Sequence, residues 1–160
     1  MKKVWWILVA ALLLCGCAQA PTFETLGDDM QAPVMQQQKQ VSLTIPDASE
    51  KIQGSTGTIY ICEDYTVTVE VLSSGNIGAT MQSITGFGPE DLTVLETAVS
   101  DITRYECAWA AAGEGGDVIG NAAVLDDGVW HYCVTVLYNA SDASKMQSVW
   151  TQILRSVILA

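Results

Sequence analysis

The stretch "SDASKMQSVWTQILRSVIL", residues 141–159, decides the fold because it carries the clearest periodic pattern in the chain. Its large apolar residues recur at intervals of three and four: Met146, Val149, Trp150, Ile153, Leu154 and Val157. This spacing predicts an amphipathic helix of about four turns, with Ser141 or Asp142 as its N-cap. We expect its apolar stripe to cover one face of a sheet, and we interpret its methionine and tryptophan as core residues rather than as a cofactor site.

The segment before this helix, "VWHYCVTVLY" (129–138), has the alternation of a strand. One face of that strand carries Trp130, Tyr132, Val134 and Val136, and the other carries His131, Cys133 and Thr135. The loop "DDG" (126–128) joins it to a strand predicted over 117–125. An Asp-Gly pair between two such runs is a strong hairpin signal.

Five more strands are predicted upstream from short β-rich runs, at residues 41–45, 58–62, 66–72, 92–97 and 103–111. The second and third of these form a hairpin around "EDY". In 66–72 the valines point to one side, and the threonines and a glutamate to the other. We therefore expect one buried and one wet face. Residues 75–86 have helical spacing, and Gly86 can cap that helix.

The order of these elements predicts an α+β domain. We expect one antiparallel sheet of about six to seven strands with two helices packed on one face, the C-terminal helix among them. Over residues 41–160, the element order and the terminal helix resemble the PsbP-like fold. That resemblance implies a binding or assembly module, although a fold alone does not assign a function.

The N-terminal residues have the pattern of an export signal. Two lysines precede an apolar run over residues 4–14, which is shorter than the about 20 residues of a membrane-spanning helix. The run ends in Leu14-Cys15-Gly16-Cys17. This end resembles the lipobox of bacterial lipoproteins, with an aliphatic residue at −3, a small residue at −1 and an invariant cysteine at +1. Cys17 fits that pattern, whereas Cys15 does not, because Leu14 would then stand at −1.

The lipobox resemblance implies cleavage between Gly16 and Cys17 and a diacylglycerol on the Cys17 thiol. Two or three acyl chains then anchor the protein to a membrane. Ala18 implies the outer membrane in a Gram-negative host, while a Gram-positive host offers the outer face of the plasma membrane. The chain accordingly divides into a signal peptide (1–16), a lipidated cysteine with a flexible spacer (17–40) and a single domain (41–160). Alternatively, "FETLGDDM" within the spacer docks on the domain.

Composition narrows the functional classes. The chain has 18 acidic and 7 basic residues, a formal net charge of −11, and every acidic residue follows Cys17. Such a surface repels nucleic acid and anionic lipid headgroups, so we exclude a nucleic-acid-binding protein. With 49% hydrophobic and 16% charged residues, the chain is not intrinsically disordered.

Three cysteines fall in the predicted domain: Cys62, Cys107 and Cys133. The absence of a CxxC pair argues against zinc-ribbon and thioredoxin-like sites. In a meander, Cys107 and Cys133 lie two strands apart, about 9–10 Å, beyond the ~7 Å Cα limit of a disulfide. Whether Cys62 pairs depends on a strand order that the sequence leaves open. We interpret all three as small buried apolar side chains.

His131 is the single histidine and shares a strand face with Cys133. That placement raises the possibility of a Cys-His dyad, also with Cys107, or of a two-ligand metal site. However, residues two apart on a strand project in parallel, about 6.5–7 Å apart at Cα. The sequence also shows no third orienting residue and no GxSxG elbow. We therefore expect His131 to be a half-exposed strand residue without a catalytic or metal-binding role.

The acidic segments 63–64, 113–117 and 126–128 could together attract calcium, but the Asp-x-Asp-x-Asp-Gly loop is missing. Successive turns of a meander also lie at opposite ends of a sheet. We interpret each segment as turn chemistry, with glycine supplying positive φ. "GEGGD" (113–117) lacks the lysine and the following helix of a phosphate-binding loop.

The sequence thus predicts a lipid-anchored extracytoplasmic protein. Its domain is expected to be a non-catalytic binding or assembly module without a cofactor, with an envelope protein or a small ligand as partner. The wet strand face and the acidic turns are the expected contact surface. The alternatives are a thiol- or metal-dependent enzyme that uses His131 with Cys133 or Cys107, and a surface antigen or envelope filler without a specific ligand.

Overall fold

The computed structural model describes residues 37–46 and 50–160, which belong to one compact unit. The predicted signal peptide (1–16) and the spacer up to residue 36 lie outside the described residues. The predicted lipid attachment at Cys17 therefore stays a prediction.

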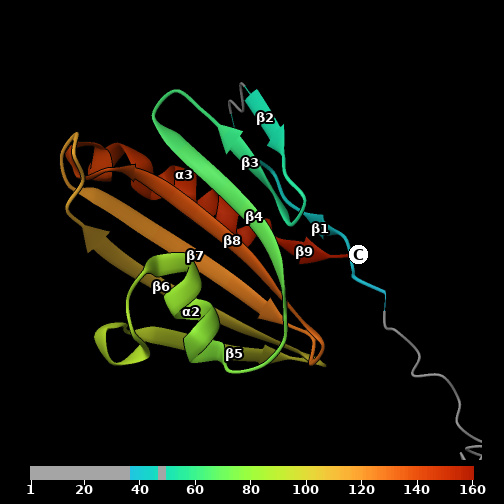
Figure 1. The fold of residues 1–160 in the computed structure, drawn as a ribbon. Helices are drawn as coiled ribbons and strands as arrows, with labels where there is room; N and C mark the ends of the chain where they lie inside the picture. Colours follow the sequence, from blue (N-terminus) through green and yellow to red (C-terminus); the bar gives the residue numbers. More distant parts are fainter. Residues whose placement is uncertain (1–36, 47–49) are drawn as a thin grey trace, which may run out of the picture. The chain divides into compact units, whose positions relative to one another are not determined.

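Among the described residues, seven antiparallel strands form the main sheet (Figure 1). In spatial order they are β2 (Glu50–Gln53), β3 (Gly57–Ile61), β4 (Tyr65–Ser73), β8 (Trp130–Asn139), β7 (Val118–Asp126), β6 (Ile102–Ala111) and β5 (Val94–Val99). The helices are α2 (Ile77–Thr85) and α3 (Ala143–Arg155), with 3₁₀ turns η1 (Pro89–Asp91) and η2 (Ala140–Asp142). The predicted α+β class, with one antiparallel sheet and two helices, is confirmed.

Local hairpins account for most neighbours in the sheet. β3 and β4 are closed by a hydrogen bond from Cys62 N to Tyr65 O at 2.9 Å. The turn between β7 and β8 uses Gly128 at φ 86°, a backbone region that favours glycine. β4 and β8, in contrast, are far apart in the sequence yet adjacent in the sheet, with Val67 opposite Val136. This non-local pairing makes them central strands and moves β5 to one edge.

The C-terminal helix covers one face of the sheet, as predicted. Its buried residues Met146, Ile153 and Leu154 belong to the same apolar cluster as Tyr132 and Val134. The alternation predicted for the last long strand is also confirmed. Its even-numbered residues from 130 to 138 join this cluster, whereas Cys133 joins a second cluster that includes residues of α2.

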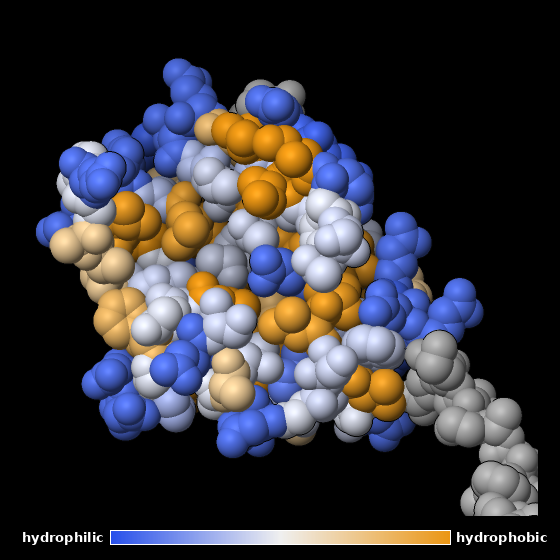
Figure 2. Space-filling view, viewed as in Figure 1, coloured by the Kyte–Doolittle hydropathy of each residue, from blue (hydrophilic) through white to orange (hydrophobic). Residues whose placement is uncertain are grey.

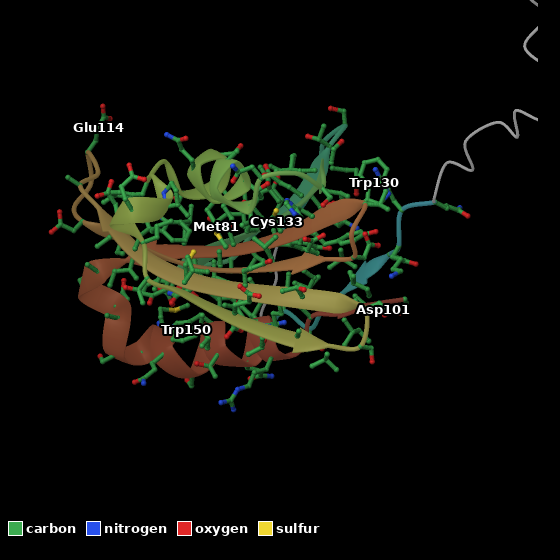
Figure 3. All side chains as sticks on the ribbon, turned by 90° about the horizontal axis from the view of Figure 1, so that it is seen from below. Met81, Asp101, Glu114, Trp130, Cys133 and Trp150 are labelled. Carbon is green, nitrogen blue, oxygen red and sulfur yellow. The ribbon has the colours of Figure 1, made fainter. Side chains whose placement is uncertain are left out.

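Helix α2 lies on the face of the sheet opposite to α3, so the prediction that both helices pack on one face is wrong. Figure 3 shows α2 and α3 on either side of the sheet, with Met81 and Trp150 on opposite sides of it. The prediction of a wet second face is also wrong where α2 covers it. Cys133 is 1% exposed and Thr135 7% exposed. By covering Cys133 and Thr135, α2 removes apolar surface from water on a face that the alternation of the strand residues predicted to be exposed.

Several elements differ from the sequence-based expectation. The strand predicted at 92–97 lies two residues further along the chain, at Val94–Val99 (β5). The strand predicted at 41–45 shortens to β1 (Val41–Ser42), which pairs with β9 (Ile158–Leu159) in a separate two-stranded sheet. Because the chain turns into β9, α3 ends at Arg155 and Val157 reaches the core from beyond the helix. β2 was not predicted, since its residues are exposed and half of them are charged.

The last residues of the predicted spacer contact the domain. Gln40 and Ala160 exchange two backbone hydrogen bonds of 3.0 and 2.9 Å, which extend the β1–β9 ladder. Lys39 N donates to the Tyr132 hydroxyl at 2.9 Å.

Candidate functional site

His131 is completely buried, with 0% exposure, rather than half-exposed as predicted. Its Nδ1 lies 2.7 Å from Thr80 Oγ1 of α2. Its Nε2 lies 3.4 Å from Asp126 Oδ2 and 3.5 Å from Ser74 Oγ. The imidazole therefore joins α2 to the ends of β4 and β7. Ser74, His131 and Asp126 have the residue types of a catalytic triad. However, the imidazole ring is fully buried, so a substrate could not contact it.

The thiol predicted as a possible partner of His131 points elsewhere. Cys133 Sγ lies 3.9 Å from the backbone oxygen of His131, while the imidazole contacts a hydroxyl and a carboxylate. Burial, together with the nearby Glu70 carboxylate, raises the pKa of the Cys133 thiol to about 12. Since the thiolate is the nucleophile and the metal ligand, this environment suppresses both kinds of chemistry.

Cys107 lies on the same side of the sheet, two strands from Cys133, and its Sγ lies 3.7 Å from Met81 Sδ. Burial raises the pKa of its thiol as well. Together with Cys62, both cysteines are free and buried, as predicted for small apolar side chains. Within residues 37–46 and 50–160, no group of three or more histidines, cysteines or carboxylates is placed to hold a metal ion.

The acidic turn before β8 serves the backbone, as predicted. Asp126 Oδ1 accepts from Gly128 N at 2.8 Å, and Asp127 Oδ1 accepts from Trp130 N at 2.8 Å. The predicted distance from the 113–117 turn is also confirmed, since Figure 3 shows Glu114 and Trp130 at opposite ends of the sheet.

Asp127 also fastens the start of the domain. Its Oδ2 accepts from the Tyr132 hydroxyl at 3.1 Å and lies 3.4 Å from Lys39 Nζ. Burial raises the pKa of this carboxyl, but hydrogen bonds from Trp130, Val129, Tyr132 and Lys39 outweigh that effect and hold the pKa below its usual value.

The β5 edge, residues 94–99, is one of the two open edges of the sheet. β5 is the last strand in the spatial order, and all six of its residues are exposed. Leu95 is 59% exposed and Val99 74% exposed. Their neighbours on β6 are Glu106 and Ile102, so one side of β5 hydrogen-bonds within the sheet while the other faces outward. An edge with apolar side chains that no other described strand pairs with is a ready template for another strand.

Two apolar hollows flank the β5 edge, one on each face of the sheet. The first, of about 220 Å³, is lined by Leu95 together with Trp150 and Leu154 of α3. The second, of about 190 Å³, is lined by Val94 and by Met81 of α2, among others. Neither helix therefore reaches far enough to cover β5.

A second apolar patch lies over β2 and β3. Ile52, Ile59 and Ile61 are 44%, 39% and 37% exposed. Figure 2 shows apolar residues gathered over this hairpin near the upper rim. β2, the edge strand of this hairpin, has four residues, and two of them, Glu50 and Lys51, are charged.

Sequence reasoning missed the partners of His131 and the openness of β5. Asp126 was recoverable, because a two-residue turn at Gly128 and Val129 sets it opposite His131 in the hairpin. Thr80 was not, since nothing in the sequence places α2 over β8. The exposure of β5 depends on the non-local pairing of β4 with β8.

No helix in the described part of the chain is long and apolar enough to cross a membrane. No protein-family model and no curated protein sequence matches the chain.

The chain is similar to solved structures at low sequence identity. A protein from Bacteroides thetaiotaomicron is 11% identical with a TM-score of 0.52 over 79% of this chain, which spans about half of that protein (49%). LpqN of Mycobacterium tuberculosis, described as involved in cell envelope biogenesis, is 10% identical with a TM-score of 0.50, covering 75% of this chain and 83% of LpqN. PA94 of Pseudomonas aeruginosa, a protein of unknown function, is 11% identical with a TM-score of 0.48, covering 79% and 87% of the two chains. The first two similarities show a shared fold, and the PsbP-like resemblance stays a prediction.

Proposed function

We propose that this protein is a lipid-anchored, extracytoplasmic assembly module of the cell envelope that binds protein partners through the β5 edge. The observation that carries the proposal is this open edge, with its exposed apolar residues and a hollow on each face. A strand added there would gain backbone hydrogen bonds and bury apolar surface, which is the usual chemistry of β-strand addition.

The proposed extracytoplasmic, membrane-anchored location is based on the sequence. The lipobox ending at Cys17 and the short apolar run before it favour export and lipid attachment. LpqN, described as involved in cell envelope biogenesis, has a role of the same kind, although a likeness at 10% identity extends to the fold alone. The anchor lies on the outer membrane in a Gram-negative host and on the plasma membrane in a Gram-positive one.

We propose a non-catalytic role because the chemistry-bearing side chains are enclosed. His131 is 0% exposed, and the Cys133 thiol, 1% exposed, has a pKa raised to about 12. A Cys133→Ser or Cys107→Ser chain that folds should therefore retain the phenotype of the wild-type chain in a deletion strain. A folded Cys133→Ser chain that fails to complement would favour the thiol-dependent enzyme instead.

The anchor is tested with two neighbouring cysteines. Wild-type and Cys15→Ser chains should incorporate labelled fatty acid and sediment with membranes, because Cys15 falls in the removed segment. A Cys17→Ser chain should remain unlabelled. It should also keep the mobility of the uncleaved precursor on a gel, and a globomycin block should likewise leave the wild-type chain uncleaved. Equal labelling of the Cys17→Ser and wild-type chains would overturn the proposed address.

The edge is tested in the anchored chain with a photo-crosslinking residue at Leu95. The matched control carries the same residue at Gln147, on the exposed polar side of α3. Position 95 should give discrete crosslinked protein bands in envelopes, and position 147 should not. Equal patterns at the two positions would contradict a binding role for β5.

A further inference from the structure

The two edges of the sheet are protected very differently. β2 is four residues long and carries Glu50 and Lys51, two of the devices by which proteins discourage edge pairing. β5 is six residues long, carries Glu96 as its single charge, and contains no proline. The long, weakly charged edge is therefore the one that accepts another strand.

The side chains of β5 divide between the two faces. Leu95, Thr97 and Val99 stand opposite Glu106, Arg104 and Ile102 of β6. Arg104 Nη2 donates to Leu154 O at 2.7 Å, so these three residues of β5 lie on the face that α3 covers. Glu96 stands opposite Tyr105, which packs with the cluster under α2.

The residue pattern of β5 is complementary to that of a second, antiparallel β5 strand. When two β5 strands pair antiparallel about a two-fold axis at Thr97, Leu95 of each copy faces Val99 of the other. Glu96 then faces Ala98, and Asp101 faces Thr93, so no carboxylate opposes another. Leu95 and Val99, the two most exposed large apolar residues in the described part of the chain, bury each other.

The two neighbouring registers that keep the two-fold axis are less favourable. An axis at Glu96 sets the two Glu96 carboxylates directly opposite each other and brings Asp91 to Asp101. An axis at Ala98 sets Asp101 opposite Leu95. Like charges directly opposite in a sheet are destabilising, and burying a carboxylate against an apolar side chain carries a desolvation cost.

We propose that the partner at the β5 edge is a second copy of this chain, paired antiparallel with Thr97 on the two-fold axis. This interface is isologous, as in most homodimers, and it joins the two sheets into one continuous sheet. The proposal rests on the β5 edge being the binding surface, but it does not depend on the lipid anchor.

Cysteine crosslinking in the full-length chain tests the register. Residues directly opposite in an antiparallel pair have Cα atoms about 4.5–5.5 Å apart, within reach of a disulfide. A Thr97→Cys chain should therefore form a disulfide-linked dimer under mild oxidation, with a doubled apparent mass on a non-reducing gel. The matched control is Ala98→Cys, because two residues 98 would lie about 8 Å apart, beyond that reach.

The wild-type chain, in which Cys62, Cys107 and Cys133 are buried, sets the background for crosslinking. Dimer from Thr97→Cys in clear excess over Ala98→Cys supports the proposal. Equal crosslinking of the two variants, or none from Thr97→Cys while a maleimide labels Cys at that position, overturns it. Occupation of the edge by a strand from another protein also gives no Thr97→Cys dimer, and so counts against a second copy.

Charged substitutions at Thr97 provide an independent test of the proposed dimer. Thr97→Glu and Thr97→Lys should each reduce the apparent mass of the native particle by half, since like charges then meet at the axis. Mixing the two variants should restore the dimer as a heterodimer. Failure of the mixture to associate, while the wild-type chain is dimeric, would assign the dimer to another surface.

Each crosslinking experiment is repeated with Cys17→Ser. Retained Thr97→Cys dimers in a Cys17→Ser chain that still incorporates labelled fatty acid as wild type does would contradict the proposed lipid anchor alone. Loss of labelling in the Cys17→Ser chain, without Thr97→Cys dimers in either background, would contradict self-pairing alone.

Discussion

The two faces of the sheet differ in what fills the space beneath their helices. Between α3 and the sheet lie large apolar side chains such as Tyr132 of β8 and Ile153 of α3, each 0% exposed. Under α2 lie smaller ones such as Ala122 and Cys133, together with the buried imidazole of His131. β8 supplies both layers, because successive side chains of a strand point to opposite faces.

This difference indicates how each face contributes to stability. Stabilisation from apolar burial grows with the area removed from water, so the α3 face should contribute most of the free energy of unfolding. The α2 face buries a polar ring, which is tolerated because Thr80 and Ser74 lie within hydrogen-bonding distance of its two nitrogens and Asp126 lies 3.4 Å from Nε2. We therefore expect the α3 face to respond to lost volume and the α2 face to respond to lost hydrogen bonds.

The largest effect is expected from removing volume under α3. Ile153→Ala should lower the free energy of unfolding by about 3 kcal/mol, since it leaves a cavity at a fully buried site. Chemical denaturation of the full-length chain measures this loss. Gln147→Ala, on the exposed side of the same helix, should change it by less than about 0.5 kcal/mol. Similar losses from both variants would show that α3 does not pack as described.

A smaller loss is expected from removing one hydroxyl under α2. Thr80→Val keeps the shape of the side chain but leaves His131 Nδ1 without its partner at 2.7 Å, which should cost about 2 kcal/mol. Thr80→Ser retains the hydroxyl and should lose less. If the valine variant were as stable as wild type, the hydrogen bond would not be what makes the buried ring tolerable.

The α3 face has its own polar contact at the end where Tyr132 reaches Asp127. Because the folded-state pKa of Asp127 is lowered, its contribution is full above the ordinary aspartate pKa of about 3.9 and is lost as pH falls through the folded-state pKa. Asp127→Asn should cost about 1.5 kcal/mol at neutral pH. Its denaturation midpoint should also fall less steeply than that of wild type below about pH 4. Parallel acid limbs for the two chains would contradict this assignment.

Much of this arrangement is predictable from local patterns. The alternation of β8 assigns Tyr132 and His131 to opposite faces, and the spacing of Met146 and Ile153 assigns α3 to the apolar one. These signals are strong because side-chain direction follows directly from backbone period. The face chosen by α2 is not predictable in this way, since it depends on packing between Met81 and strands far along the chain.

The candidate surface shows the same limit. The segment 92–97 was predicted as an ordinary strand, and whether that strand is central or at an edge is decided by the pairing of β4 with β8. Conversely, the residues with the most chemical promise, His131 and Cys133, were correctly placed on one face. Their burial by α2 is a non-local effect that removes them from solvent.

The smallest effect separates the starts of the two helices. Asn76 caps α2 by accepting from Gly78 N at 2.8 Å and Ala79 N at 3.4 Å, whereas Asp142, at the N-cap of α3, makes no side-chain capping bond. Asn76→Ala should therefore cost about 1 kcal/mol. Asp142→Ala should cost only a few tenths, from its charge near the positive end of the helix dipole. Thermal denaturation of both variants makes the comparison. Equal losses would mean that the Asn76 cap adds nothing to the attachment of α2. Helix α2 would then be held on the sheet by packing and by the hydrogen bond between Thr80 and His131 alone.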